Sequence, residues 1–353
     1  MRLAASGPYA ARRLHIGAGT IGDVTMRERL RKLIDSALLR LAPPSPHRLL
    51  QLADNHWMPF IGAIAAIALA LAIVVPLALA TKSDQNDPFV LQSADGARFV
   101  AELNGDGDTW VLLGHMFPTK RTKPTHRGIW HKFAERLVAE GYRVLRWDFR
   151  CHGDTPCVYS DRPIEDVPEI HLEWEAAIDY AVEEGAEKIY GIGVSMGGTS
   201  LMQVAAYRDE FVAVSAISSP NIFPNKPPKD SERADEDGFD KLDGLSTVAD
   251  IDVPKLYIAG ARNQCSYWQS NRYFKAAGEP VRFVLYETDL HGTEILDDEE
   301  IGPDAVQEVL DFLADPHGIS GKEMRNLAPG ADPDHECWPP DEDEDDQQEE
   351  AAD

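Results

Sequence analysis

Residues 188–198, KIYGIGVSMGG, decide the fold of this chain. The apolar run predicts a buried strand and the residues after it predict a helix, so Ser195 falls on a sharp strand-to-helix turn. Gly193 and Gly197, two positions before and after the serine, are small enough for the chain to turn that tightly. Such a turn exposes the hydroxyl and directs the next backbone N–H, that of Met196, to where an oxyanion would form. Ser195 is therefore a candidate nucleophile.

Apolar strands alternate with amphipathic helices on both sides of this turn. The patterns predict strands over 88–92, 98–103, 110–113, 142–147, 188–194, 211–217, 255–259 and 281–286, and helices over 129–140, 172–184, 199–207 and 304–314. Strands that alternate with helices form a mostly parallel sheet with both faces covered. We expect an α/β domain over residues 82–318 whose central sheet has about eight strands flanked by helices.

Charge is distributed unevenly along the 353 residues, whose net charge is −26. Residues 1–56 contain nine Lys or Arg and four acidic residues, so this segment is basic and the remainder carries −31. The strong negative charge of residues 57–353 argues against nucleic acid as a partner, because proteins bind nucleic acids by neutralising their phosphates with basic side chains. Residues 341–350 contain eight acidic side chains, and we expect residues 319–353 to form a disordered tail.

The run FIGAIAAIALALAIVVPLALA, residues 60–80, has no charged side chain and is long enough to cross a bilayer. Trp57 precedes it and Lys82 follows it, as is typical of membrane interfaces. We expect one transmembrane helix over residues 57–81. The basic excess of residues 1–56 then places the N-terminus in the cytoplasm and the acidic domain outside.

Two alternatives remain for the N-terminal part. The tripeptide Ala78-Leu79-Ala80 has the small-x-small form of a signal cleavage site. The preceding residues are too many for a signal peptide, unless Met26 is the true start. Alternatively, residues 1–56 carry the function and the outer domain is a sensor. The basic, partly amphipathic composition of residues 1–56 fits attachment to anionic lipid at least as well.

A serine nucleophile needs a base, a group that orients the base and an oxyanion hole. His291 follows the last predicted strand in YETDLHGTEIL, and parallel strands end at one edge of a sheet. We therefore expect His291 to reach Ser195 as the general base. The loop after strand 110–113 lies at the same edge and is the expected source of a second oxyanion donor.

At this loop the chain, which reads GHMFP, resembles the α/β-hydrolase superfamily, in which a His-Gly-x-x loop often occupies this position. Met116 replaces the glycine, and the resemblance implies the backbone N–H of Phe117 as the second donor. The segment DFRCHGDT, residues 148–155, is similar to the superfamily's DxRGxGxS segment, with Cys151 in place of its glycine. The resemblance covers roughly residues 88–316 and implies the α/β-hydrolase fold.

The residue that orients His291 departs from the family pattern. The superfamily has Gly-x-x-Asp after the strand 255–259, whereas this chain reads GARN and has Asn263 at the aspartate position. Three interpretations remain: Asn263 itself orients His291, an acid from elsewhere does so, or the site is inactive. The candidate acids are Asp289, Glu287, Asp235, Glu236 and Asp237.

Four cysteines allow three pairings. Cys151 and Cys157 are close enough in sequence to form a loop disulfide, and Cys265 and Cys337 are the remaining pair. Neither cysteines nor histidines have zinc-site spacing. We expect no metal and no organic cofactor.

These observations favour a single-pass membrane-anchored, outward-facing serine hydrolase that cleaves carboxylic esters of small molecules through an acyl-enzyme. Residues 218–252 are too polar and too rich in proline for a substantial lid, so we expect an open site. Acyl transfer and short-peptide hydrolysis are alternatives that the same residues could perform. A non-catalytic binding domain of the same fold is an alternative of another class, favoured by Asn263.

Overall fold

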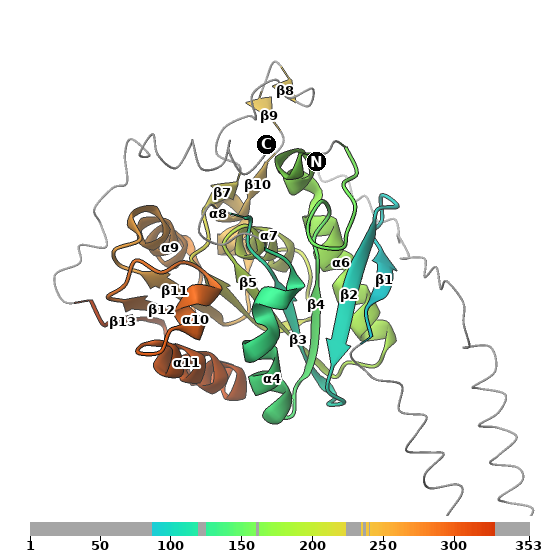
Figure 1. Ribbon diagram of the computed structural model, residues 1–353. Helices are drawn as coiled ribbons and strands as arrows, with labels where there is room; N and C mark the ends of the chain where they lie inside the picture. The colour runs from blue at the N-terminus through green and yellow to red at the C-terminus, as the bar shows by residue number, and fades with distance from the viewer. Residues whose placement is uncertain are drawn as a thin grey trace, which may run out of the picture. The chain divides into compact units, whose positions relative to one another are not determined.

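The structure, a computed structural model, describes residues 87–118, 125–159, 162–223, 234–235, 238–239 and 241–328. Its central element is a nine-stranded sheet (Figure 1). In the order in which they lie side by side, the strands are β1 (Phe89–Gln92), β2 (Arg98–Asn104), β4 (Arg143–Trp147), β3 (Thr109–Gly114), β5 (Lys188–Val194), β6 (Phe211–Ile217), β11 (Lys255–Gly260), β12 (Val281–Tyr286) and β13 (Lys322–Asn326).

The sheet is mostly parallel, as predicted. β2 runs antiparallel to its neighbours β1 and β4, and every other neighbouring pair is parallel. All six residues of β11 and six of the seven in β5 are buried. Such continuous burial is expected where helices cover both faces of a sheet, and it explains why these strands read as unbroken apolar runs.

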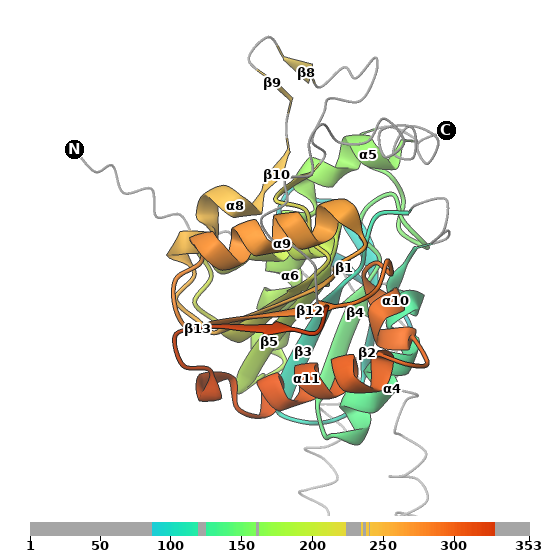
Figure 2. The ribbon, with the colours of Figure 1, turned by 90° about the vertical axis from the view of Figure 1, so that its left-hand side faces the viewer.

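Helices cover both faces of the sheet (Figure 2). On one face, α6 (His171–Glu183), α7 (Met196–Ala205) and α9 (Gln264–Ala276) pack over an apolar cluster that includes Trp174, Leu201 and Tyr273. On the other face, α4 (His131–Ala139) and α11 (Gly302–Ala314) pack over a second cluster that includes Phe133 and Phe312. Burial of these two apolar layers supplies the main driving force for the fold.

The connection between β6 and β11 is built of short elements in its described part. β7 (Ile222–Phe223) pairs with β10 (Leu242–Asp243), and β8 (Ala234–Asp235) pairs with β9 (Gly238–Phe239). α8 (Gly244–Thr247) then leads back toward the sheet. The Tyr273 hydroxyl of α9 donates to the Pro220 carbonyl at 2.9 Å, which ties the start of this connection to the core.

The last strand corrects the predicted domain boundary. Residues 319–353 were expected to be a disordered tail, but Lys322–Asn326 form β13, parallel to β12. Backbone hydrogen bonds and ion pairs hold this edge strand, since Arg282 pairs with Glu323 at 2.8 Å and Arg325 with Asp304 at 2.9 Å. The tail prediction is therefore wrong for residues 319–328, because the β12–β13 ladder and these ion pairs hold a strand that has few buried apolar side chains of its own.

The predicted transmembrane helix, residues 57–81, and the basic segment, residues 1–56, lie outside the described residues. Within the described part of the chain, no helix combines the length and the apolar character needed to cross a bilayer.

Candidate active site

The carboxyl ends of the parallel strands meet at one edge of the sheet. Gly114 at the end of β3 lies opposite Gly193 near the end of β5, and β11 and β12 end opposite each other. In a sheet of this kind the loops at that edge form the binding crevice. The predicted site residues on these loops are Phe117 after β3, Ser195 after β5, Asn263 after β11 and His291 after β12.

Ser195 has a left-handed backbone, with φ 49° and ψ −123°. For a residue with a β-carbon this backbone conformation costs about 1–3 kcal/mol, and it persists only where the surrounding structure enforces it. Here Ser195 lies between β5 and α7, and its N–H donates to the Ile217 carbonyl at 2.9 Å. The hydroxyl makes no capping bond to the helix. This is the geometry of a nucleophile elbow.

The glycines around Ser195 are required by close contacts. A β-carbon on Gly193 would lie 2.5 Å from the Gly198 α-carbon, and one on Gly197 would lie 2.5 Å from the His115 carbonyl oxygen. Both distances are far below van der Waals contact, so only glycine lets α7 approach β5 and the loop after β3 this closely. The Trp174 indole also donates to the Gly197 carbonyl at 3.2 Å, which fixes the start of α7.

The two predicted oxyanion donors are the backbone N–H groups of Met196 and Phe117, and neither has a hydrogen-bond acceptor among the described residues. Met196 is the first residue of α7, so its N–H has no acceptor within the helix. Among the described residues, neither this N–H nor that of Phe117 donates a hydrogen bond. Both side chains are buried. Two unpaired N–H groups that follow neighbouring strands are suited to binding a developing negative charge.

His115 fixes the loop that carries Phe117. The Phe149 N–H donates to Nε2 of His115 at 3.0 Å, so the ring proton is on Nδ1, which donates to the Met116 carbonyl at 2.8 Å. The ring is fully buried. Burial holds the pKa of His115 well below its usual value, and the neighbouring His152 lowers this pKa further. His115 is thus a neutral, structural histidine.

The loop of His291 lies against the end of β5. A β-carbon on Gly292 would be 3.6 Å from the Val194 β-carbon and 2.9 Å from the Met116 sulfur. The residue after the predicted base therefore lies beside the residue before the predicted nucleophile. Glu294 of α10 (Thr293–Asp297) accepts from the His291 N–H at 3.0 Å, which holds the backbone of the predicted base.

Asn263 contacts the imidazole of His291. Its Nδ2 lies 3.3 Å from Nδ1 of His291 and 3.4 Å from the Asp289 carbonyl oxygen. Asn263 is the N-cap residue of α9 and makes no side-chain capping bond there, so its amide is directed to the loop of His291. Sequence reasoning named Asn263 as one candidate for this position.

The alternative acids have different positions. Asp289 is exposed and meets Asn263 through its backbone carbonyl. Glu287 pairs with Arg262 at 2.7 Å. Asp235 is described in its backbone alone, and residues 236–237 lie outside the described residues.

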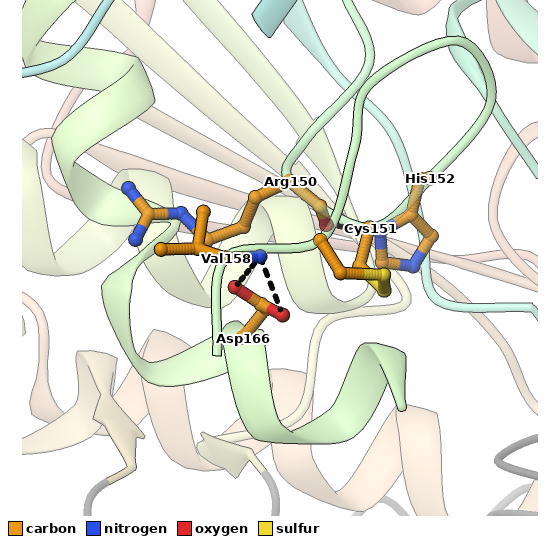
Figure 3. The surroundings of a disulfide bond; sticks show 6 residues. Arg150, Cys151, His152, Val158 and Asp166 are labelled. Carbon is orange, nitrogen blue, oxygen red and sulfur yellow. Dashed lines mark hydrogen bonds between the residues drawn. A yellow bond between two sulfur atoms is a disulfide. The ribbon is translucent and has the colours of Figure 1, made fainter. Parts of the chain in front are cut away.

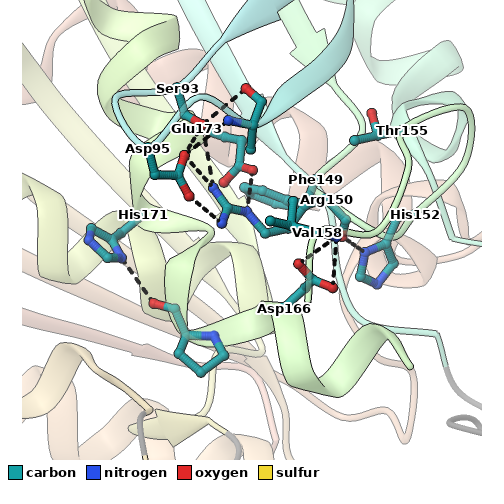
Figure 4. A network of polar contacts seen from close by, with 12 residues as sticks. Ser93, Asp95, Phe149, Arg150, His152, Thr155, Val158, Asp166, His171 and Glu173 are labelled. Carbon is teal, nitrogen blue, oxygen red and sulfur yellow. Dashed lines mark hydrogen bonds and ion pairs between the residues drawn. The ribbon is translucent and has the colours of Figure 1, made fainter. Parts of the chain in front are cut away.

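The loop after β4 packs beside the oxyanion loop. Arg150 is fully buried between Glu173 at 2.6 Å and Asp95 at 2.8 Å (Figure 4). Burial opposes its charge, but the two carboxylates dominate and raise the pKa of Arg150. The Arg150 carbonyl accepts from Nδ1 of His152 at 2.8 Å. Burial lowers the pKa of His152 to about 4, so its ring is neutral near pH 7.

A disulfide joins Cys151 to Cys157 within this loop (Figure 3). This confirms the pairing that sequence proximity suggested. The carboxylate of Asp166, on α5 (Pro163–Asp166), accepts from the Val158 N–H at 3.1 Å and so fixes the chain just beyond the second cysteine. The side chain of Cys265 and the whole of Cys337 lie outside the described residues.

Three residues at this edge escaped the sequence reasoning: Glu294, His115 as a structural group, and His152. Glu294 is the second residue of α10, whose N-cap is Gly292, so it does not fit a capping box and no sequence pattern marked it. Nothing in the sequence indicates that the rings of His115 and His152 lie 5.0 Å apart, because this contact joins loops of different strands.

Comparison with known proteins agrees with this architecture. Residues 124–339 match the alpha/beta hydrolase family. The quorum-quenching protein AidA of Acinetobacter baumannii (strain MDR-ZJ06) is 36% identical over 87 residues, covering 23% of this chain and 27% of that protein. The chain therefore matches about a quarter of that relative's length.

Two solved structures have a similar fold. A hydrolase from Pseudomonas aeruginosa PA01 is 17% identical, with a TM-score of 0.51 over 64% of this chain and 98% of that one. Est1E from Butyrivibrio proteoclasticus, solved with ferulic acid bound, is 20% identical, with a TM-score of 0.51 over 65% of this chain and 99% of that one. Identities this low show the fold alone. The family match, however, spans more than half of the sequence and coincides with the parallel sheet and the serine turn, so this chain belongs to the alpha/beta hydrolase family.

Proposed function

We propose that this chain is a serine hydrolase that cleaves carboxylic esters of small molecules through an acyl-enzyme. The observation that carries the proposal is the left-handed backbone of Ser195 at the sheet edge that also holds the Asn263–His291 pair. A strained serine is retained where its position matters, and the strain here lies beside an imidazole loop and two unpaired N–H groups.

In the first half of the reaction, Nε2 of His291 takes the proton of Ser195 as the hydroxyl oxygen attacks the ester carbonyl. The carbonyl oxygen becomes negative, and the N–H groups of Met196 and Phe117 hold it. The C–O bond to the leaving alcohol then breaks. The imidazolium returns its proton to that alcohol, leaving the acyl group on Ser195.

In the second half, His291 removes a proton from water as the water oxygen attacks the acyl carbonyl. The same two N–H groups hold the negative carbonyl oxygen. The bond to Ser195 then breaks, the imidazolium returns its proton to the serine oxygen, and the carboxylic acid leaves. Acyl transfer would replace this water with another alcohol, and hydrolysis of a short peptide would replace the leaving alcohol with an amine. The same residues would perform either reaction.

The proposal includes a membrane tether. The uncharged run at residues 60–80 supports a single transmembrane helix over residues 57–81, and the basic residues before it support a cytoplasmic N-terminus. The hydrolase domain would then face outward. The Cys151–Cys157 disulfide is consistent with an oxidising environment.

The test is covalent labelling of the full-length chain with a fluorophosphonate, beside Ser195→Ala. We expect the parent to be labelled and the variant to remain unlabelled, and the parent to hydrolyse short-chain p-nitrophenyl esters. A folded parent that neither labels nor hydrolyses any ester of the panel would contradict the proposal. Extraction with sodium carbonate tests the tether, since a spanning chain stays in the membrane fraction.

One observation favours a second candidate, a non-catalytic binding domain of the same fold. Nδ2 of Asn263 faces Nδ1 of His291, and an amide N–H that donates there leaves the ring proton on Nε2. In that tautomer His291 cannot accept the proton of Ser195. Absence of labelling in the parent, together with labelling in Asn263→Asp, would favour this candidate.

A further inference from the structure

Cys151 has a backbone conformation that favours glycine. Its φ is 62°, in the left-handed region where a β-carbon crowds the neighbouring carbonyl. The only disulfide that the described residues contain joins this same residue to Cys157. The backbone N–H of Cys151 also donates to the Pro156 carbonyl at 3.2 Å, which closes the loop across its base. The covalent bond thus holds in place a conformation that cysteine would otherwise leave.

The next residue, His152, contacts the loop of the predicted oxyanion hole. Its ring centroid lies 5.0 Å from that of His115 and 5.6 Å from that of Phe117, both in edge-to-face geometry. Nδ1 is bonded to the Arg150 carbonyl, so the ring cannot turn freely. Nε2 is buried and has no hydrogen-bond partner among the described residues. The ring is therefore held by its backbone bond and by packing on the two residues that define the oxyanion loop.

A second connection joins the same two loops. The Phe149 N–H donates to His115, and His115 in turn donates to the carbonyl of Met116, directly before Phe117. A change of backbone conformation at Cys151 would move His152 and strain this connection. The direction of the Phe117 N–H depends on it, because the Met116 carbonyl and the Phe117 N–H belong to one rigid peptide unit.

We propose that the Cys151–Cys157 disulfide and His152 form a positioning unit for the Phe117 N–H, so that full turnover depends on the backbone conformation that the disulfide holds at Cys151. None of the three residues touches the reacting atoms in this proposal. It rests on the proposed serine hydrolase function of the same site. An oxyanion donor acts more strongly on the transition state than on the bound ester, so displacement of Phe117 should lower kcat and leave KM nearly unchanged.

The proposal predicts a response to dithiols. A dithiol thiolate attacks one sulfur of the Cys151–Cys157 bond, forming a mixed disulfide and releasing the other cysteine as a thiol. The second thiol of the reagent then displaces the remaining cysteine. The reagent leaves as a cyclic disulfide, having given two electrons, and both protein cysteines are thiols. Without the bond, Cys151 should relax from its left-handed conformation.

Two double variants separate the covalent bond from the conformation that it holds. Cys151→Gly with Cys157→Ser removes the bond but accepts the left-handed φ, whereas Cys151→Ala with Cys157→Ser removes the bond and resists that φ. We expect the alanine pair to lose about tenfold in kcat for a p-nitrophenyl ester, below the 10²–10³ of a deleted donor. KM should change less than about twofold, and the glycine pair should recover most of the lost kcat.

Dithiothreitol supplies the second arm. We expect it to lower kcat of the parent toward that of the alanine pair and to leave the glycine pair unchanged. His152→Ala should lower kcat similarly and should add little to the alanine pair, since the two changes act through one contact. The melting temperature of each variant identifies any loss of activity that comes from unfolding.

The outcomes distinguish this inference from the function on which it rests. A parent that labels at Ser195 and turns over, with unchanged kcat in the alanine pair, would overturn the positioning unit alone. So would an alanine pair that is not rescued by glycine, or a full additive loss in the His152→Ala combination. A parent that neither labels nor turns over would overturn both proposals.

Discussion

Nδ2 of Asn263 lies 3.3 Å from Nδ1 of His291, where a serine triad has a carboxylate oxygen. With the amide donating, the ring carries its proton on Nε2 and cannot act as a base toward Ser195. Turning the amide by half a rotation would bring Oδ1 opposite Nδ1 and restore the catalytic tautomer. It would also give up the Nδ2 bond to the Asp289 carbonyl at 3.4 Å. Asparagine therefore opposes the tautomer that catalysis needs.

Asn263→Asp should raise kcat. A carboxylate only accepts hydrogen bonds, so it fixes the proton on Nδ1 and stabilises the imidazolium that forms. The reverse replacement costs about 10⁴ in a serine triad, and we expect a gain of at least about tenfold. Steady-state hydrolysis of a p-nitrophenyl ester measures it.

Asn263→Leu is the matched control: it removes the amide that opposes the catalytic tautomer but supplies no carboxylate to hold the ring, so its kcat should stay well below that of Asn263→Asp. Unchanged kcat in both variants, with the fold retained, would remove Asn263 from the orienting role and direct attention to Asp289.

Ser195→Gly should stabilise the protein relative to Ser195→Ala. Both variants lose the hydroxyl, which makes no capping bond, but alanine keeps the β-carbon that strains φ at 49°. We expect the free energy of unfolding of the glycine variant to exceed that of the alanine variant by about 1–2 kcal/mol. Urea denaturation of the two proteins checks this. Equal stabilities would mean that the turn is not strained at this residue.

The turn at Ser195 shows what could be predicted from the sequence. Its glycines, its apolar strand and its place between strand and helix are local features, and the structure has all of them. The alternation of apolar strands and amphipathic helices likewise predicted the sheet and eight of its nine strands, because both patterns come from residues close together in the chain.

The features that the sequence did not predict depend on contacts between residues far apart in the chain or on a covalent bond. The strand Lys322–Asn326 has little apolar content and is half exposed, so no pattern marks it, and Arg282 and Asp304 stabilise it from other elements. Helix α9 follows a loop at Asn263 and shows only a weak apolar stripe. The left-handed φ of Cys151 was also unexpected, because the disulfide to Cys157 that accompanies it could not be established from the sequence.

Gly198→Ala should destabilise the protein, because there is no room for a β-carbon where α7 meets β5. The added atom would overlap the Ser219 hydroxyl and lie 2.9 Å from the Gly193 carbonyl oxygen. Overpacking of this kind costs about 1–3 kcal/mol in the free energy of unfolding. Gly278→Ala is the control, since its added β-carbon would meet nothing closer than 3.9 Å. If both variants unfolded at the same urea concentration, the close approach at Gly198 would be disproved.

The buried His152 should make stability depend on pH. Its pKa is about 4 in the folded protein and 6.5 in an unfolded chain, because burial disfavours the charged ring. A lowered folded-state pKa contributes stability that is fully present above pH 6.5 and is lost as the pH falls toward 4. Between pH 7 and pH 5 this one group should cost about 2 kcal/mol of the free energy of unfolding.

Urea unfolding of the parent and of His152→Phe at pH 7 and pH 5 measures that contribution. The phenylalanine ring retains the packing on His115 and Phe117 but cannot be protonated, so the variant should lose less stability on acidification than the parent does. His317→Phe replaces an exposed histidine instead, and this variant should lose as much stability between pH 7 and pH 5 as the parent does. If His152→Phe lost as much stability as the parent, the ring of His152 would have to be solvated in the folded protein, against its burial between the two loops.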